Sequence, residues 1–170
     1  MRTLNRHLWA GALALGLVFI ALGALFIFTG LEAKGTISAA LAEENITTSA
    51  DAVKFGVPAG VLVTDAKTAE AMAEVIKMHS FDRYGRYSDM DRDDPNRAAY
   101  IKGLTLRNSL NMSVMAFGIA DLAIGTGSII ILMGAGTMAL AAPALYYATA
   151  KEGTAEAKTG APTAPLAPAV

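Results

Sequence analysis

The feature that most constrains the fold is an uninterrupted apolar run near the N-terminus, from Leu8 to Leu31. It contains no charged residue, and a helix needs about 20 apolar residues to cross the hydrocarbon core of a bilayer. The whole chain is also more apolar than an ordinary soluble domain, with 54% hydrophobic and 17% charged residues. The run therefore predicts a transmembrane helix.

A cleavable signal peptide is the alternative interpretation of this run. Signal peptides have an apolar core of about 7–15 residues, which is shorter than Leu8–Leu31. However, Ala40-Leu41-Ala42 has the small-x-small pattern of a cleavage site. We expect an uncleaved helix, and cleavage stays open as the alternative.

A second apolar block, Met112–Tyr147, lies towards the other end of the chain. As one helix it would be more than about 50 Å long, whereas the hydrocarbon core is about 30 Å thick. Part of the block must therefore lie outside the core. Two registers fit, Leu122–Tyr147 and Val114–Met138, and we expect Pro143 to mark the inner end of the span.

Asp121 is the one ionisable residue within these blocks, which makes it a candidate intramembrane polar site. In the register Leu122–Tyr147 it lies at the outer interface. In the register Val114–Met138 it lies in the outer third of the bilayer and needs a partner, such as Ser113, Thr126 or a group on another subunit.

The two spans predict a hairpin in the plasma membrane. Trp9, Tyr146 and Tyr147 would form an aromatic belt on one side, and Arg2 and Arg6 favour a cytoplasmic N-terminus. The expected fold class is mainly α, a two-transmembrane-helix hairpin with a mostly helical extracytoplasmic segment. The expected segments are a cytoplasmic N-terminus (1–7), transmembrane helix 1 (8–31), an extracytoplasmic segment (32–109), transmembrane helix 2 with extensions (110–147) and a disordered cytoplasmic tail (148–170).

Small residues recur every seven positions in both blocks. Such a repeat keeps roughly one face of a helix, and in lipid close backbone approach through small residues supplies helix–helix packing. The pattern predicts a packing face that serves the hairpin, a homo-oligomer or a partner subunit. In the first block the repeat predicts packing at Gly16, Gly23 and Gly30. In the second block it forms two series, one of Gly118 and Gly125 and one of Ala120, Gly127, Gly134 and Ala141.

The polar segment between the blocks predicts a helix after Thr64 or Asp65, one of which would cap it. Short runs of β-favouring residues precede this helix at Val53–Val57 and Val61–Thr64. A second helix is expected to start with Asp94 as its cap, because Pro95 fits the first helical position, and to continue into the second block.

The stretch "MHSFDRYGRYSDMDRDDPNR", Met78–Arg97, concentrates the groups that chemistry would need. Counted from Asp89 it has Asp94 and Tyr100 where an EF-hand needs glycine and glutamate, which leaves only an irregular calcium site as an alternative. We interpret His79 as a helix-end cation or a packed residue. A catalytic or metal role is the less favoured alternative.

Composition excludes several classes of site. The chain has no cysteine, which excludes disulfides, thiolate zinc sites, iron–sulfur clusters and cysteine nucleophiles. Its net charge of −1 gives no basic surface for nucleic acid. No metal site and no cofactor is expected.

Three stretches in the same order and spacing carry a resemblance: "ENITTSADA", "AEVIKMHS…GRYSDMDRDDPNR" and "LRNSLNMSVMAFGIADLAIGTGSIIILMG". The chain resembles a group of small bacterial, mostly actinobacterial, membrane proteins often labelled aromatic ring-opening dioxygenase. The resemblance covers about Met1–Gly134 and implies two membrane helices around an extracytoplasmic segment. From the resemblance we expect the relatives to carry an apolar residue at the position of Asp121, which makes Asp121 a departure of this chain. The label names an iron-dependent enzyme class, and this chain offers no ligand set for iron.

The hypothesis that follows is a non-catalytic membrane accessory or scaffold subunit rather than an enzyme. Its expected partners are the lipid bilayer and a protein partner or a second copy of the chain, bound through small-residue helix faces and the outer loop. The alternative is a small oligomeric channel or ion-responsive membrane protein that uses Asp121.

Overall fold

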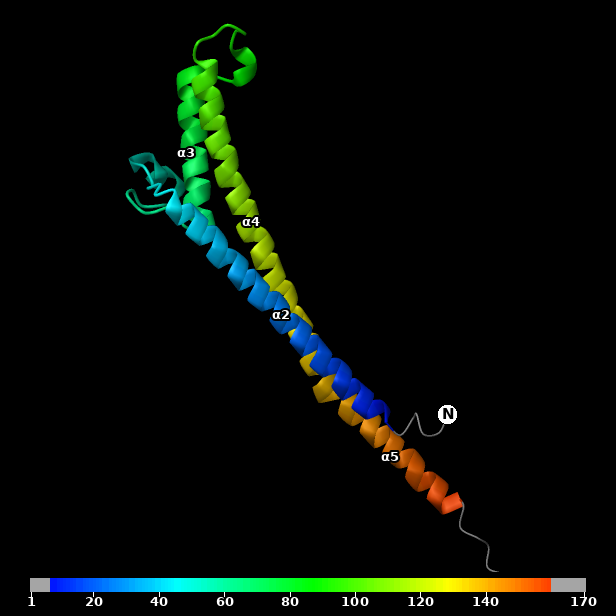
Figure 1. Ribbon diagram of the computed structural model, residues 1–170. Helices are drawn as coiled ribbons and strands as arrows, with labels where there is room; N and C mark the ends of the chain where they lie inside the picture. Colours follow the sequence, from blue (N-terminus) through cyan, green and yellow to red (C-terminus); the bar gives the residue numbers. More distant parts are fainter. Residues whose placement is uncertain (1–6, 160–170) are drawn as a thin grey trace, which may run out of the picture. The chain divides into compact units, whose positions relative to one another are not determined.

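A computed structural model describes residues 7–159, with side chains up to residue 151, and these residues are mainly helical (Figure 1). The described part has no strand, only an isolated bridge between Thr47 and Leu62. Helix α2, Leu8–Glu43, and the helical run Arg97–Lys151 are long and apolar enough to cross a membrane. The expectation of a mainly α chain with two long apolar helices is confirmed for the described residues.

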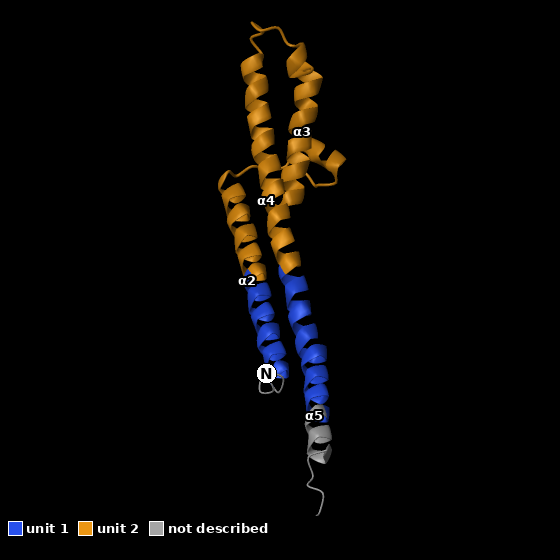
Figure 2. Ribbon diagram, turned by 90° about the vertical axis from the view of Figure 1, so that its right-hand side faces the viewer, with its two compact units in different colours: residues 1–25, 127–170 blue, residues 26–126 orange. Residues whose placement is uncertain are grey.

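The chain divides into two compact units (Figure 2). Unit 1 comprises Met1–Leu25 and Gly127–Val170, and unit 2 comprises Phe26–Thr126. Helices α2 and α4, Arg97–Gly136, each contribute one part to both units. Each of the two long helices therefore contains part of an apolar block and also contributes residues to unit 2, which includes the polar segment.

The core of unit 2 joins the polar segment to the long helices. Helix α3, Ala66–Tyr84, and the preceding turns supply half of the main cluster, and α2 and α4 supply the rest. Its buried members are Leu41, Val63, Ala69, Ala73, Leu110 and Phe117. Because α2 continues past Leu31 and buries Leu41 in this core, cleavage at Ala40–Ala42 would remove a core side chain.

The start of α3 follows the predicted cap. Asp65 Oδ1 accepts a hydrogen bond from the backbone N–H of Thr68 at 2.8 Å. The Thr68 hydroxyl in turn accepts one from the backbone N–H of Asp65, which completes a capping box. The helix ends at Tyr84, followed by Gly85 with φ 72°, a conformation that suits glycine.

The two predicted β-favouring runs are not strands. Most of Val53–Val57 lies in the 3₁₀ helix η1, Ala50–Phe55, and Val61–Thr64 contributes only the bridge at Leu62. The second run pairs only briefly with a neighbouring segment, since Thr48 N–H donates to Val61 O and Val63 N–H donates to Ile46 O, both at 2.8 Å. The buried Thr48 hydroxyl also accepts from Val61 N–H at 2.9 Å and donates to Pro58 O at 2.6 Å, which holds the turn before this run.

In unit 1 a π-helical turn, η3, Thr137–Ala141, connects α4 to α5, Ala142–Thr159. Helix α5 continues through Pro143, so the expected inner end of the span at Pro143 does not coincide with a helix end. A proline inside a helix lacks an N–H and crowds the preceding turn, and the wider π turn directly before Pro143 accommodates both effects. Residues 148–159 are accordingly helical where disorder was expected, while 1–6 and 160–170 lie outside the described residues.

Candidate functional site

The first candidate feature is a glycine contact between α2 and α4 in unit 1. A Cβ added to Gly23 would lie 2.5 Å from the Gly127 carbonyl oxygen, and one added to Gly134 would lie 2.6 Å from the Gly16 carbonyl oxygen. A Cβ at Gly16 would overlap the Met138 side chain. Gly16, Gly23 and Gly134 therefore leave no room for a side chain, and Gly127 takes part through its carbonyl oxygen, so these four predicted packing residues contact one another within one chain.

Gly30 makes the equivalent contact in unit 2. A Cβ added there would lie 2.7 Å from the Ile124 side chain and 2.8 Å from the Ala120 carbonyl oxygen. In unit 1 Gly16 meets Gly134 and Gly23 meets Gly127, so the two helix segments run antiparallel there. Close contacts of this kind are what small residues permit.

Gly118 and Gly125 do not take part in this contact. Both are exposed, and nothing lies within 4 Å of a Cβ added to either. The reason is helical geometry, since two residues of offset from Ala120 and Gly127 rotate a position by roughly 200° around the helix. Gly118 and Gly125 therefore do not serve the packing of the described chain, and their predicted packing with a second copy or a partner subunit stays a prediction.

The seven-residue series of small residues on α4 is displaced by one residue at its end. Ala120 is buried and Gly127 and Gly134 follow it on the same face, but the next buried position is Ala142, 4% exposed, rather than the expected Ala141. The π turn η3 adds the extra residue that shifts the register. This shift also places Tyr146 edge-on against Trp9, with ring centroids 5.9 Å apart.

The second candidate feature is an ion pair between Lys34 on α2 and Asp121 on α4. Lys34 Nζ donates to Asp121 Oδ1 at 2.6 Å, and the side chains are 37% and 61% exposed. Ser113, one partner considered from sequence, instead donates to the Ser109 carbonyl oxygen. The partner of Asp121 in the described chain is thus a lysine that sequence reasoning did not consider, although it is the first basic residue after the first apolar block.

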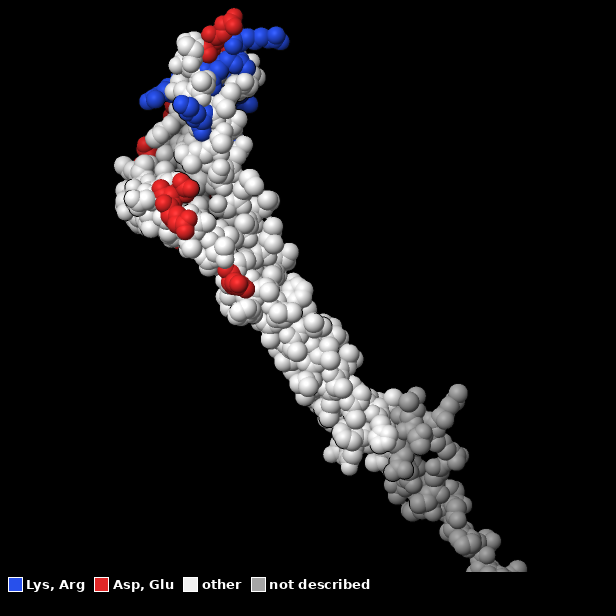
Figure 3. Space-filling model, viewed as in Figure 1, with Lys and Arg blue, Asp and Glu red and all other residues white. Residues whose placement is uncertain are grey.

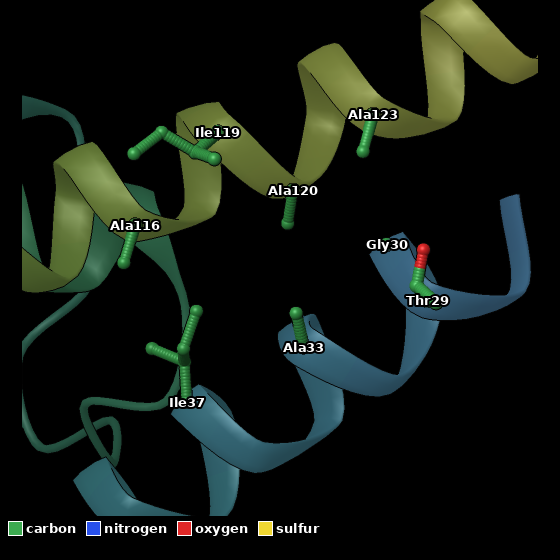
Figure 4. A pocket seen from close by; sticks show the side chains of 8 residues that line it. All are labelled: Thr29, Gly30, Ala33, Ile37, Ala116, Ile119, Ala120 and Ala123. Carbon is green, nitrogen blue, oxygen red and sulfur yellow. The ribbon is translucent and has the colours of Figure 1, made fainter. Parts of the chain in front are cut away.

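A shallow apolar groove of about 290 Å³ lies between α2 and α4 in unit 2 (Figure 4). Small side chains of both helices form its walls, and none of them can ionise. The lining residues are Thr29, Gly30, Ala33, Ile37, Ala116, Ile119, Ala120 and Ala123. The groove can accommodate apolar material but offers no group for acid, base or nucleophilic chemistry.

A third feature links η1 to α3 through Asp51. Lys54 Nζ lies 2.7 Å from Asp51 Oδ1, and His79 Nε2 lies 2.8 Å from Asp51 Oδ2. An ionised carboxylate only accepts hydrogen bonds, so the proton of the second bond lies on Nε2. The hydrogen bond from Lys54, followed by that from His79, lowers the pKa of Asp51 below its ordinary value of 3.8. His79 thus lies near the end of α3, as expected, with a carboxylate partner that the sequence did not indicate.

The charged stretch after α3 forms a loop held by Arg97. The Arg97 guanidinium donates to the carbonyl oxygens of Met90 at 2.9 Å and Asp91 at 3.1 Å, and it lies 4.2 Å from the centre of the Tyr87 ring. Asp94 Oδ1 accepts from Asn96 N–H, as a helix cap would, although α4 is assigned from Arg97. On the face shown in Figure 3, charged side chains gather over this region.

No group of three or more His, Cys, Asp or Glu residues in the described part of the chain is arranged to hold a metal ion. Asp89, Asp91 and Asp93 therefore do not form a cluster with ligand geometry, and the Asp51–His79 pair stands without a third acidic or histidine ligand. The features of the described residues are therefore close helix packing, the Lys34–Asp121 ion pair between α2 and α4, and the Asp51–His79 pair between η1 and α3. Comparisons of the chain with protein-family models, with curated proteins and with solved structures give no match.

Proposed function

We propose that this protein is a non-catalytic integral membrane protein that acts as an accessory or scaffold subunit. Its two long apolar helices would form a membrane hairpin with both termini in the cytoplasm and residues 32–109 outside. The support comes from the length and apolar composition of the helices and from Arg2 and Arg6 before the first span.

The contacts between the helices favour one of the two registers for the second span. In unit 1 Trp9 meets Tyr146, and in unit 2 Gly30 meets Ala120 and Ile124. The α4 and α5 residues opposite Leu8–Leu31 are then roughly Leu122–Tyr147, a stretch without a charged residue. Asp121 and Lys34 would in that case lie together at the outer interface, where a long lysine side chain reaches the headgroup region.

The observation that carries the proposal is the division of the small residues of α4 between two faces. The small residues on one face of α4 contact α2, whereas Gly118 and Gly125 are exposed on the other face. In lipid, such a face is suited to the close approach of another helix. An ion-conducting role for Asp121 has less support, because its carboxylate already has a cation partner in the same chain.

The test is purification of the full chain in mild detergent, followed by native mass spectrometry. We expect an assembly larger than one chain, and we expect Gly118→Leu with Gly125→Leu to weaken it. Gly11→Leu is the matched control, because Gly11 is an exposed glycine on α2 with nothing within 4 Å of an added Cβ. A strictly monomeric particle with no other bound protein would overturn the proposal.

A further inference from the structure

The Lys34–Asp121 pair retains hydrogen-bonding capacity that this chain does not use. One carboxylate oxygen of Asp121 and one N–H of the Lys34 ammonium form the bond, and no other partner of either group occurs in the described residues. The Asp121 side chain is 61% exposed. A carboxylate has about four acceptor positions and an ammonium has three donors, so both groups can bind a second partner.

The two charges are self-complementary under a two-fold axis. Because Lys34 and Asp121 touch within one chain, they lie at the same level along the helices. A second copy in the same membrane orientation, related by an axis along the membrane normal, presents both charges at that level too. Each carboxylate can then face the lysine of the other copy, as an isologous interface requires.

The helix surface around Asp121 permits a close approach. Asp121 follows Gly118 by three residues and precedes Gly125 by four, so the three lie on one face of α4. Neither glycine has a neighbour within 4 Å of an added Cβ. Leu122, 69% exposed, borders this face. The short aspartate side chain can reach across an interface only where the backbones come near each other.

We propose that a second copy of this chain docks on the face formed by Gly118, Asp121, Leu122 and Gly125, with Lys34 beside it. In the resulting two-fold dimer, each Asp121 carboxylate accepts hydrogen bonds from Lys34 of its own chain and from Lys34 of the partner subunit. This inference rests on the proposed membrane scaffold function and names its partner as the chain itself.

The decisive experiment uses two differently tagged full-length variants. Asp121→Lys leaves only positive charge at the pair, and Lys34→Asp leaves only negative charge, so each variant loses the pair within its own chain. Alone, each should show a dimer affinity at least about tenfold lower than the wild type, because like charges meet. Co-expressed, they should form a mixed dimer, since only pairing between chains can then restore the charge match.

A second measurement leaves the charge pair intact in case the charge variants fail to fold. The chain has no cysteine, so single cysteines report contacts without background. Leu122→Cys should form a disulfide-linked dimer in membranes, whereas Ile119→Cys should not. Ile119 is the matched control because it is 60% exposed at nearly the same level but lines the groove on another side of α4.

Three outcomes would overturn the inference: a monomeric wild-type chain, a mixed dimer no stronger than either variant alone, or equal cross-linking through both cysteines. A monomeric chain bound to a different protein would overturn the dimer and leave the scaffold function standing. A lone monomer would overturn both. A dimer that passes these tests but binds no other protein supports the inference and limits the scaffold to self-association.

Discussion

Lys34 Nζ lies 2.6 Å from Asp121 Oδ1, across 87 residues of sequence. The pair ties α2 to α4 one turn beyond the close contact of Gly30 with Ala120. The lysine thus neutralises the one carboxylate within the second apolar block. Lys34 is also the first basic residue after the first apolar block, where the chain becomes polar again.

Removal of the charge of Lys34 or of Asp121 should destabilise the protein. The double variant should lose less stability than the sum of the losses in the two single variants. Lys34→Gln or Asp121→Asn should lower the free energy of unfolding by about 0.5–2 kcal/mol, because the remaining group loses its partner. The measurement is a double-mutant cycle of unfolding in detergent at one protein concentration. Glu32→Gln, on the same helix and without an ion pair among the described residues, should change little. Additive effects of Lys34→Gln and Asp121→Asn would argue against the pair.

Gly23 should tolerate no side chain. Gly23→Leu places atoms where the Gly127 carbonyl and the Ile131 side chain lie, so the helices must separate. We expect a loss of about 1–3 kcal/mol or more in the free energy of unfolding, as for overpacked cores. Gly11→Leu should stay within about 0.5 kcal/mol of the wild type, as expected for an open surface site. Equal effects of the two changes would contradict this contact.

The Asp51 cluster should respond to acid. Because the pKa of Asp51 in the folded protein lies below its ordinary value of 3.8, ionisation favours the folded state. The stabilising contribution is fully present above pH 3.8 and is lost as the pH falls through the lowered pKa. The difference in stability between wild type and Asp51→Asn should therefore vanish in acid.

Of the two partners of Asp51, Lys54 should have the larger effect on the pKa of the Asp51 carboxyl group. The hydrogen bond from Lys54 is the largest cause of the lowered pKa, and that from His79 comes second. Lys54→Met should therefore raise the pKa of Asp51 more than His79→Gln does, as followed by NMR titration of the carboxyl group. The reverse order would show that His79 dominates the electrostatics of Asp51.

Deletion of one residue from the π turn should disturb the end of the helix contact. Removal of Leu140 would rotate all that follows by roughly 100°, which moves Ala142 out of its buried position and Tyr146 away from Trp9. Trp9 is the one tryptophan of the sequence, so its fluorescence should shift in the deletion variant when Tyr146 leaves its ring. An unchanged emission spectrum would mean that the extra residue does not set the register.

Arg97→Lys should loosen the loop that precedes α4. The planar guanidinium of Arg97 binds the Met90 and Asp91 carbonyl oxygens and lies over the Tyr87 ring. Lysine keeps the positive charge but has no such planar group, so it cannot make the same set of contacts. We expect limited proteolysis in residues 85–96 to become faster. Arg92→Lys, in the same loop, is the control; unchanged cleavage in Arg97→Lys would remove the proposed role.

Much of the helical architecture follows from local sequence. The uncharged runs, the Asp65 cap and the Asp94 turn act over one or two helical turns, so α2, α3 and the start of α4 are predictable from neighbouring residues alone. The β-favouring runs around Val53 and Val61 show the limit of this approach. The first run lies mostly in η1, and the second makes only two backbone hydrogen bonds around the Thr47–Leu62 bridge.

The sequence alone determined that two apolar helices flank a polar segment and that small residues repeat along them, because length, hydrophobicity and period are properties of a single segment. Only the tertiary structure decided which glycine face is used, that Lys34 is the partner of Asp121, and that the seven-residue series shifts at η3. The physical reason is that a repeat specifies a face of one helix but not its partner. The partner depends on the register between residues far apart in the chain, and one extra residue in a π turn changes that register without a clear sign in composition.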